Sequence, residues 1–209
     1  MQSSVVLVFV LTCIPLVLAP GPSVAFILAT TLSSGRRIAM SAVAGVELGY
    51  VAHVIAAAAG ISAILAASAA AFTAVKIAGA CYLVWLGIRA WRSRDLRLLG
   101  ELGSAGGATR PGAAFRRGLV IGILNPKTAV FFLSFLPQFV RPDAGPAWFQ
   151  MTMLGLLFIV LAAMPDTLWA LGGGAVARLF PRTRVRTTER ISGTVFFGLA
   201  GYSLTARHA

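Results

Sequence analysis

Long apolar stretches separated by short polar gaps dominate the pattern of this 209-residue chain. Most of the stretches reach the length of about 20 residues that a helix needs to cross a bilayer, so we predict a transmembrane helix in each. The last stretch is the weakest, because its uninterrupted apolar part begins only at Ile191. The six predicted spans are Val5–Leu32, Ile38–Leu65, Phe72–Trp91, Leu119–Val140, Phe149–Leu171 and Thr187–Thr205.

Composition agrees with an all-α polytopic membrane protein. Hydrophobic residues make up 58% of the chain and charged residues only 11%, whereas soluble domains carry about 25% charged residues. A net charge of +12 would suggest nucleic acid for a soluble protein. Here the cations crowd into a few gaps between apolar stretches, which favours a role in membrane orientation, and we expect no nucleic-acid partner.

The charge of the gaps alternates along the chain. The first, third and fifth gaps hold fourteen arginines together, and the second and fourth hold one, Arg141. Loops rich in Lys and Arg stay in the cytoplasm. We therefore place the first, third and fifth gaps in the cytoplasm and both termini outside.

The third gap divides the chain into two halves of three spans. We treat residues 1–209 as one transmembrane domain, with a first repeat at 1–92, a cytoplasmic linker at 93–118 and a second repeat at 119–209. The linker contains a Gly/Ser-rich run that is typical of flexible connections. Because each half has an odd number of spans, the second half must be inserted upside down relative to the first.

A short sequence signature recurs in the two halves. Lys76-Ile77-Ala78-Gly79 is followed by Gly87, and Arg190-Ile191-Ser192-Gly193 is followed by Gly201. Inverted repeats whose helices are interrupted at matching positions indicate a transporter site near the middle of the membrane. Close helix packing through small residues is the simpler explanation of the glycines alone.

The first span of each half is broken by proline. In Asn125-Pro126-Lys127, Asn125 is a good N-cap and Pro126 suits the first helical position. In Pro20-Gly21-Pro22, Gly21 and Pro22 take these two places. We predict two half-helices that start near the midplane from opposite directions, so that their positive ends converge. The Lys127 ammonium, which costs about 2.5–3.5 kcal/mol at mid-membrane, completes a carboxylate-binding device.

Further ionisable residues inside the predicted spans include Glu47, His53 and Asp166. We expect them to hold a substrate ammonium group or to carry a coupled proton. Structural alternatives stay open for each. Asp166, about five residues from the cytoplasmic end of its predicted span, could pair with Arg178 or cap the helix. Glu47 could be a partner of Lys127, and His53 a satisfied polar contact.

Other function classes receive less support. The sequence lacks the Gly-x-Ser-x-Gly, Walker-type and His-Glu-x-x-His motifs, and we expect neither catalysis nor a cofactor. A metal-ion exporter of related fold is the alternative, although only Glu47 and Asp166 offer carboxylates within the spans. Cys13 and Cys81 lie singly in apolar stretches, so we predict no bound metal. An intramembrane enzyme using His53 and Glu47 and a non-transporting structural protein complete the alternatives.

Several stretches, in this order, resemble the LysE/RhtB family of amino-acid exporters. The resemblance rests on Ala19-Pro20-Gly21-Pro22 through Gly35-Arg36-Arg37, Gly45, Gly49, His53, Gly60-Ile61-Ser62-Ala63, the stretch from Lys76 to Gly87, and Gly122-Ile123-Leu124-Asn125-Pro126-Lys127 through Phe135-Leu136-Pro137-Gln138-Phe139. It covers nearly the whole chain.

The resemblance implies efflux of amino acids or their derivatives across a bacterial inner membrane, driven by the proton gradient. The family's Pro-Gly-Pro and Asn-Pro-Lys motifs carry substrate-binding roles over to Pro20, Gly21, Pro22, Asn125, Pro126 and Lys127. Family members often have Asn where this chain has Ser23, whose hydroxyl can still bond a ligand. The sequence looks more like the threonine/homoserine-type branch than the basic amino-acid branch. The expected partners are an amino acid, protons and lipid, and a homo-oligomer is left open.

Overall fold

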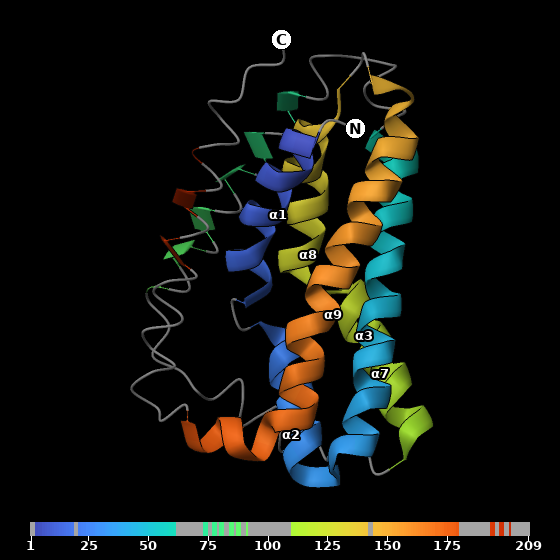
Figure 1. Ribbon diagram of the computed structural model, residues 1–209, viewed down its shortest axis with the longest axis vertical. Helices are drawn as coiled ribbons and strands as arrows, with labels where there is room; N and C mark the ends of the chain where they lie inside the picture. The colour runs from blue at the N-terminus through green and yellow to red at the C-terminus, as the bar shows by residue number, and fades with distance from the viewer. Residues whose placement is uncertain are drawn as a thin grey trace.

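The computed structural model is helical, with no strand among the residues that it describes. These residues are 3–18, 21–61, 110–141 and 144–179, with short pieces between 73 and 91 and between 193 and 201. Four of the six predicted spans are therefore described along most of their length (Figure 1). Most of the third and sixth spans, and residues 93–109 of the linker, lie outside the described residues.

The first predicted span consists of two helices. α1 covers Ser3–Leu18 and α2 covers Pro22–Ser34, and the axis bends by 51° between them. The predicted break is therefore confirmed, with Pro22 as the first residue of α2 and Gly21 as its N-cap. In Figure 1 the pair descends from the top of the molecule to its base.

The second span follows after a single residue. Gly35 has φ 83°, a left-handed conformation that favours glycine, and it turns the chain from α2 into α3. Helix α3 covers Arg36–Ala56 and continues into a π-helical turn, η1, at Ala57–Ile61. It rises from the base to the top of the molecule (Figure 1), as the hydropathy pattern predicts.

The fourth span is also broken where the sequence predicts. It consists of α7 (Pro111–Ile123), α8 (Pro126–Val130), a π-helical turn η2 (Phe131–Phe135) and a 3-10 helix η3 (Leu136–Phe139). Helix α7 begins eight residues before the predicted start at Leu119, so it extends into the stretch expected to be linker. Helices α7 and α8 rise in Figure 1, opposite to α1 and α2.

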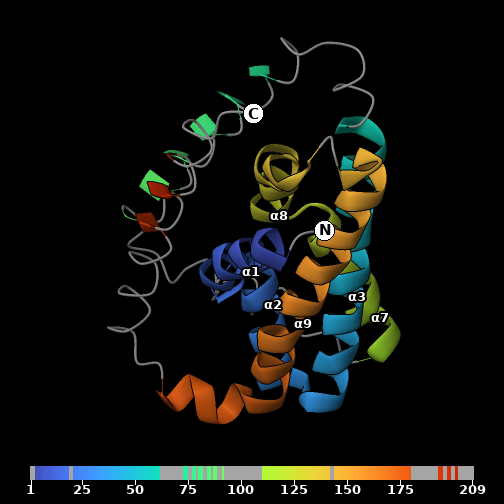
Figure 2. The ribbon, with the colours of Figure 1, turned by 45° about the horizontal axis from the view of Figure 1, so that its top comes forward.

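The fifth span is one long helix, α9, over Ala147–Leu179 with Pro165 inside it. It packs against α1, α2 and α3 (Figure 2). Helix α9 extends past the predicted span end at Leu171. The part of it that is long and apolar enough to cross a membrane ends at Gly173, so the predicted place of Asp166 near the end of the span is not contradicted. Because the helix continues to Leu179, Asp166 does not cap the C-terminal end of α9.

Length and composition allow several of these helices to cross a membrane. Arg36–Gly60, Pro111–Phe139 and Ala147–Gly173 qualify singly, and the bent pair Val5–Leu18 and Pro22–Ser34 brings the number to four within the described residues. Many large apolar side chains face outward, including Leu48, Val160 and Leu168, as expected where lipid is the solvent. The chain is a multi-pass membrane protein.

Helices α3 and α7 approach each other through glycines. A Cβ atom added to Gly49 would lie 2.7 Å from the Leu119 carbonyl oxygen and from the Gly122 Cα atom. Added Cβ atoms at Gly45 and Gly118 would also collide with backbone of the facing helix. Small residues spaced by four allow such backbone contact in membranes. The pair therefore forms a tightly packed frame.

We predict that Gly49→Ala destabilises the protein by about 1–3 kcal/mol, because the new methyl group must push two backbones apart. Gly112→Ala is the matched control, since a Cβ atom added there meets nothing within 4 Å. Thermal unfolding in detergent micelles measures both variants. Equal midpoints for Gly49→Ala and the unmodified protein would contradict the close contact.

Candidate functional site

The first turns of α2 and α8 meet near mid-height of the bundle (Figure 1). A Cβ atom added to Gly21 would lie 3.6 Å from both Cε and Nζ of Lys127, so the N-cap of α2 lies against this lysine. The caps differ. The Asn125 side chain accepts a hydrogen bond from the Lys127 backbone N–H at 3.1 Å, whereas Gly21 provides no side-chain cap. The start of α2 therefore keeps backbone donors for another acceptor.

A polar triangle joins the two breaks to α3. The Asn125 Nδ2 atom donates to the Ser23 Oγ atom at 2.8 Å and to the Tyr50 hydroxyl at 3.2 Å. The Ser23 and Tyr50 hydroxyls are 2.9 Å apart and hydrogen-bonded. All three residues are buried, and such buried polar groups need partners of this kind. Ser23 and Asn125 are predicted site residues that the fold brings together.

Lys127 reaches back to the end of α1. Its Nζ atom donates to the Leu16 carbonyl oxygen at 3.1 Å. This carbonyl belongs to the last turn of α1, and the residue four positions later is Pro20, which has no N–H to offer it. A side chain of the second half of the chain thus donates a hydrogen bond to a backbone carbonyl of the first half.

Two carboxyl groups accompany this cation. Asp166 on α9 is 4% exposed, and its charge interacts with that of Lys127. Glu47 on α3 faces Asp166, although no well-formed hydrogen bond joins them, because neither Glu47 oxygen has a hydrogen-bond partner among the described residues. The charges therefore run in the order ammonium, carboxyl, carboxyl across three helices. The proposed alternative of a direct Glu47–Lys127 pair is less favoured by this order.

His53 occupies a different place. Its Nε2 atom lies 3.1 Å from the Gly122 carbonyl oxygen, and because a carbonyl only accepts, Nε2 carries the proton. The residue four positions after Gly122 is Pro126, so the helical donor is missing here too, and only a longer bond of 3.3 Å from the Asn125 N–H replaces it. The imidazole also packs near the Phe132 ring, with ring centroids 6.0 Å apart.

A small cavity lies between the breaks. Its free volume is about 10 Å³, enough for roughly one water molecule, so an amino acid enters only if the helices move. Both apolar and polar side chains line it. The lining residues are Val17, Gly21, Ser23, Val24, Tyr50, Lys127, Thr128, Phe158, Ala162 and Asp166.

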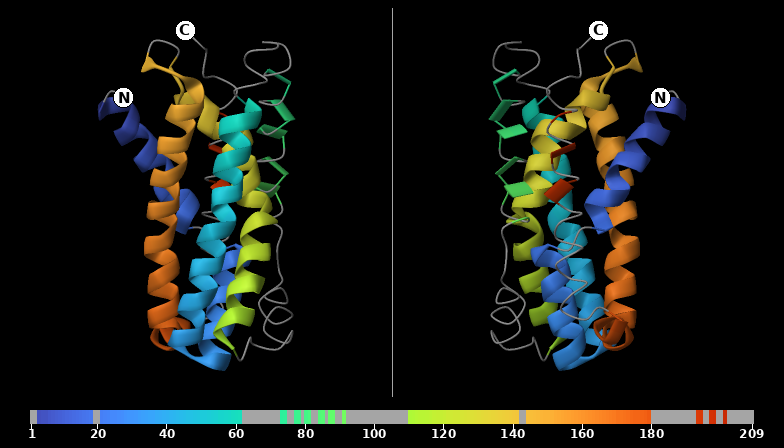
Figure 3. Two further views of the ribbon diagram at one scale, coloured as in Figure 1. Left: turned by 90° about the vertical axis from the view of Figure 1, so that its right-hand side faces the viewer. Right: turned by 90° about the vertical axis from the view of Figure 1, so that its left-hand side faces the viewer.

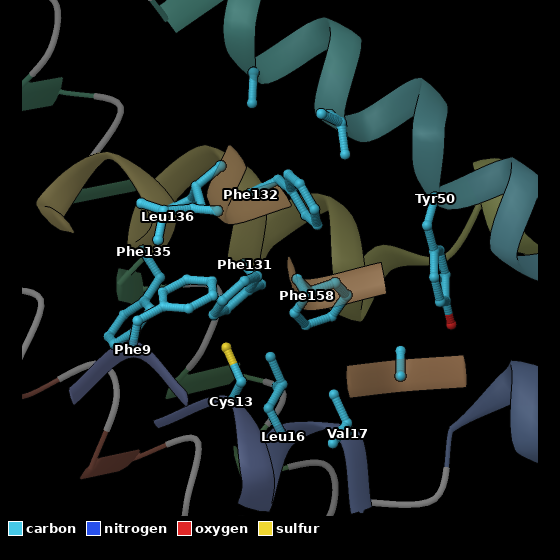
Figure 4. Packing of buried hydrophobic residues seen from close by; sticks show 14 of the residues in the cluster. Phe9, Cys13, Leu16, Val17, Tyr50, Phe131, Phe132, Phe135, Leu136 and Phe158 are labelled. Atoms are coloured by element: carbon cyan, nitrogen blue, oxygen red, sulfur yellow. The ribbon is translucent and has the colours of Figure 1, made fainter. Parts of the chain in front are cut away.

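Aromatic rings from α1, η2 and α9 pack together (Figure 4), and one of them, Phe158, lines the cavity. Phe158 of α9 stacks on Phe131 with ring centroids 4.8 Å apart. Phe9 of α1 packs edge-on against Phe139 at 5.1 Å. These contacts attach the N-terminal half of α1 to η3, and η2 to α9.

The outcome for the predicted site residues is mixed. Gly21, Ser23, Lys127 and Asp166 line one cavity, and Asn125 lies beside it. Pro20 lies outside the described residues, and the roles of Pro22 and Pro126 are to begin helices. Glu47 and His53 are not among the lining residues, and their roles stay predictions.

Sequence reasoning missed the four apolar lining residues and two polar ones, Tyr50 and Thr128. Tyr50 follows Glu47 by three residues and so shares its helix face, and this spacing was the available signal. Thr128 directly follows the Asn-Pro-Lys motif. Both are common residue types in membrane helices, and only the fold turns their hydroxyls toward the break.

A family model described as LysE type translocator matches residues 14–207. The chain belongs to this family. The prediction of the LysE/RhtB family from the sequence is thereby confirmed, and the match extends over nearly the whole chain.

Relatives of the LysE-type chain include named efflux proteins. It is 30% identical to a homoserine/homoserine lactone efflux protein of Salmonella typhimurium, over 96% of each chain. It is 28% identical to a leucine efflux protein of Enterobacter sp., over 90% of this chain and 88% of the other. An uncharacterized membrane protein of Vibrio cholerae is 31% identical over 99% and 100% of the two chains. No solved structure matches.

These comparisons place the chain among amino-acid efflux transporters. They give no support to the metal-export alternative, and the described residues contain no group of three or more His, Cys, Asp or Glu that could hold a metal ion. The named relatives are efflux proteins rather than enzymes.

We predict that His53→Leu destabilises the protein by about 1 kcal/mol, the net value of an average hydrogen bond, because it removes a donor from the Gly122 carbonyl. His53→Gln keeps an N–H donor and should recover much of this loss. Thermal unfolding and the pH profile of efflux are measured for both variants. A changed pH profile with unchanged stability would instead support the predicted proton-carrying role.

Proposed function

We propose that this LysE-type chain is a secondary active transporter that exports small neutral amino acids or their derivatives from the bacterial cytoplasm. The single observation that carries the proposal is the placement of Lys127 against the uncapped start of α2, with Asp166 facing its ammonium. A zwitterion matches this arrangement, because its carboxylate and ammonium need partners of opposite charge a few ångströms apart.

The carboxylate end of the substrate is bound by Lys127 and by the backbone N–H groups at the start of α2. This 13-residue helix contributes a positive end that favours an anion. The substrate ammonium is bound by Asp166, with Glu47 behind it. Val17, Val24, Phe158 and Ala162 supply an apolar wall, which suits an aliphatic or short hydroxylated side chain.

Proton coupling rests on the two carboxyl groups. Two carboxylates side by side in a buried place repel each other, so one proton shared between Glu47 and Asp166 relieves the repulsion. Arrival of the substrate ammonium favours the fully ionised pair and releases that proton, and uptake of a proton from outside resets the pair. One zwitterion is thereby exported in exchange for one proton that moves inward.

Alternating access follows from an inverted arrangement of two three-span repeats. It is supported by the opposite directions of α1–α2 and α7–α8, each broken at mid-height (Figure 1). Contact between Gly87 and Gly193, where an added Cβ atom on Gly87 would lie 3.1 Å from the Gly193 carbonyl oxygen, joins pieces of the third and sixth spans. From the arginine-rich gaps we infer that the base of the bundle faces the cytoplasm, that both termini lie outside, and that the membrane is the bacterial inner membrane.

We expect Lys127→Ala to lower the apparent affinity for the exported amino acid by roughly 10- to 100-fold, the equivalent of one charged hydrogen bond. Preloaded cells are followed by mass spectrometry of the medium, with neutral, basic and acidic amino acids in the panel. Arg37→Ala, which removes an exposed cation at the start of α3, is the control and should export normally. The proposal fails if the unmodified protein exports no amino acid, or if Lys127→Ala exports as well as it does.

Substitution of the carboxyl pair should separate coupling from transport. In proteoliposomes, Asp166→Asn should lose accumulation driven by an imposed pH gradient, because the pair no longer releases a proton, while Glu47→Gln should weaken it. Glu101→Gln makes the same kind of change outside the spans and should behave as the unmodified protein. Full pH-driven accumulation by Asp166→Asn would exclude this residue from coupling.

A further inference from the structure

Thr128 is a buried residue whose hydroxyl lacks a hydrogen-bond partner. Its side chain is 1% exposed, it lines the cavity, and its Oγ1 atom has no partner among the described residues. The Tyr50 hydroxyl lies near it without forming a good bond. An unpaired buried hydroxyl costs about 1–3 kcal/mol. A group retained at such a cost beside a substrate cavity is best explained by a partner that arrives from outside the protein.

The neighbouring ammonium is partly engaged by the protein itself. Lys127 Nζ donates to the Leu16 carbonyl oxygen, which the proline at position 20 leaves without its helical donor. A carboxylate is a stronger acceptor than a carbonyl, because charge roughly doubles the strength of a hydrogen bond. The Leu16 carbonyl therefore occupies a position in which a substrate carboxylate would form a stronger hydrogen bond with the Lys127 ammonium.

We propose that Thr128 and Lys127 form the carboxylate subsite of the transporter, and that the Leu16 carbonyl occupies it until substrate displaces the end of α1. The proposal rests on the proposed function and adds a residue and a movement to it. The incoming carboxylate accepts from the Lys127 ammonium and the Thr128 hydroxyl together. The Leu16 carbonyl is released, and Val17, the adjoining wall of the cavity, moves away with it.

The packing of the helices favours movement of α1 over the other parts. The α3–α7 frame is held by backbone contacts at glycines. A larger residue at any of these glycines would force the two helices apart. Helix α1 lies oblique to the other helices (Figure 3). Phe9, about two turns before Leu16, fixes it to Phe139. A tilt about Phe9 withdraws Leu16 and Val17 and leaves the aromatic contacts in place. The cavity, now large enough for about one water molecule, widens where the substrate must fit.

Thr128→Val tests the subsite, because it keeps the shape of the side chain and removes only the hydroxyl. We expect unchanged or raised thermal stability, since an unpaired buried group is lost, together with a several-fold weaker affinity for L-leucine or L-homoserine, whichever the protein exports. The primary amide of the same amino acid should bind equally to both forms. Thr30→Val is the control, because the Thr30 hydroxyl bonds to the Phe26 carbonyl of its own helix and Thr30 is not among the cavity-lining residues.

Spin labels test the movement of α1. One pair is placed at Leu18→Cys and Ile55→Cys, both exposed, in protein with Cys13 and Cys81 replaced by alanine. A reference pair at Ile55→Cys and Gly112→Cys lies on the α3–α7 frame. The free amino acid should change the Leu18–Ile55 distance, and its amide should not. Lys127→Met should show the changed distance without any ligand, and the reference distance should stay constant throughout.

The outcomes separate this proposal from the proposed function. Intact efflux with no movement of α1, or equal effects of acid and amide, overturns the subsite and leaves the exporter. If no amino acid is exported, the proposed function fails. An unchanged α1 in ligand-free Lys127→Met overturns the displacement step independently, because that comparison needs no substrate. Lower stability of Thr128→Val with unchanged affinity would show that the hydroxyl serves the fold alone.

Discussion

The structure depends on one constraint of the bilayer, that every backbone carbonyl inside it needs a donor. A proline removes the donor due to the carbonyl four residues earlier. At the first break this carbonyl belongs to Leu16 and is served by Lys127; at the second it belongs to Gly122 and is served by His53. Each donor comes from the opposite half of the chain. Each break is thus stabilised by a side chain from the other half of the chain. The cavity is lined by residues of both breaks.

Local rules predicted the breaks themselves. Gly21 and Asn125 are N-caps, and Pro22 and Pro126 begin helices, because capping depends on residues within one turn and can be predicted from the sequence. The partners of these breaks could not be predicted in the same way. Tyr50 meets Asn125 across 75 residues and His53 meets Gly122 across 69, and no local pattern encodes such pairing. The end of α9 was missed for a related reason, since hydropathy ends a span at the lipid boundary although the helix continues to Leu179.

Glycine contacts hold α3 and α7 tightly together. Helix α1, which we propose to move, is packed differently. Gly45 and Gly49 meet the α7 backbone directly, so dispersion contacts between α3 and α7 are lost sharply with any separation. Helix α1 instead contacts its neighbours through long side chains such as Phe9 and Leu16, which tolerate small rotations. The sequence signals this difference only through the glycine spacing, which fits close packing and repeat symmetry equally well.

Under the proposed function, the charges of the site favour a zwitterion over an anion or a cation as cargo. Lys127, Asp166 and Glu47 leave the site near neutral when the carboxyl pair holds one proton, so the closed cavity carries little net charge through the membrane. A zwitterion is itself neutral and supplies both missing partners, a carboxylate for the ammonium and an ammonium for the carboxyl pair. Once the proton has left, the loaded site carries one negative charge. A metal dication would leave Lys127 as a like charge beside it, and repulsion of this kind is large in a medium of low dielectric constant. Under the proposed function, the lysine that donates to the Leu16 carbonyl at the first break is also the group that selects the chemistry of the cargo.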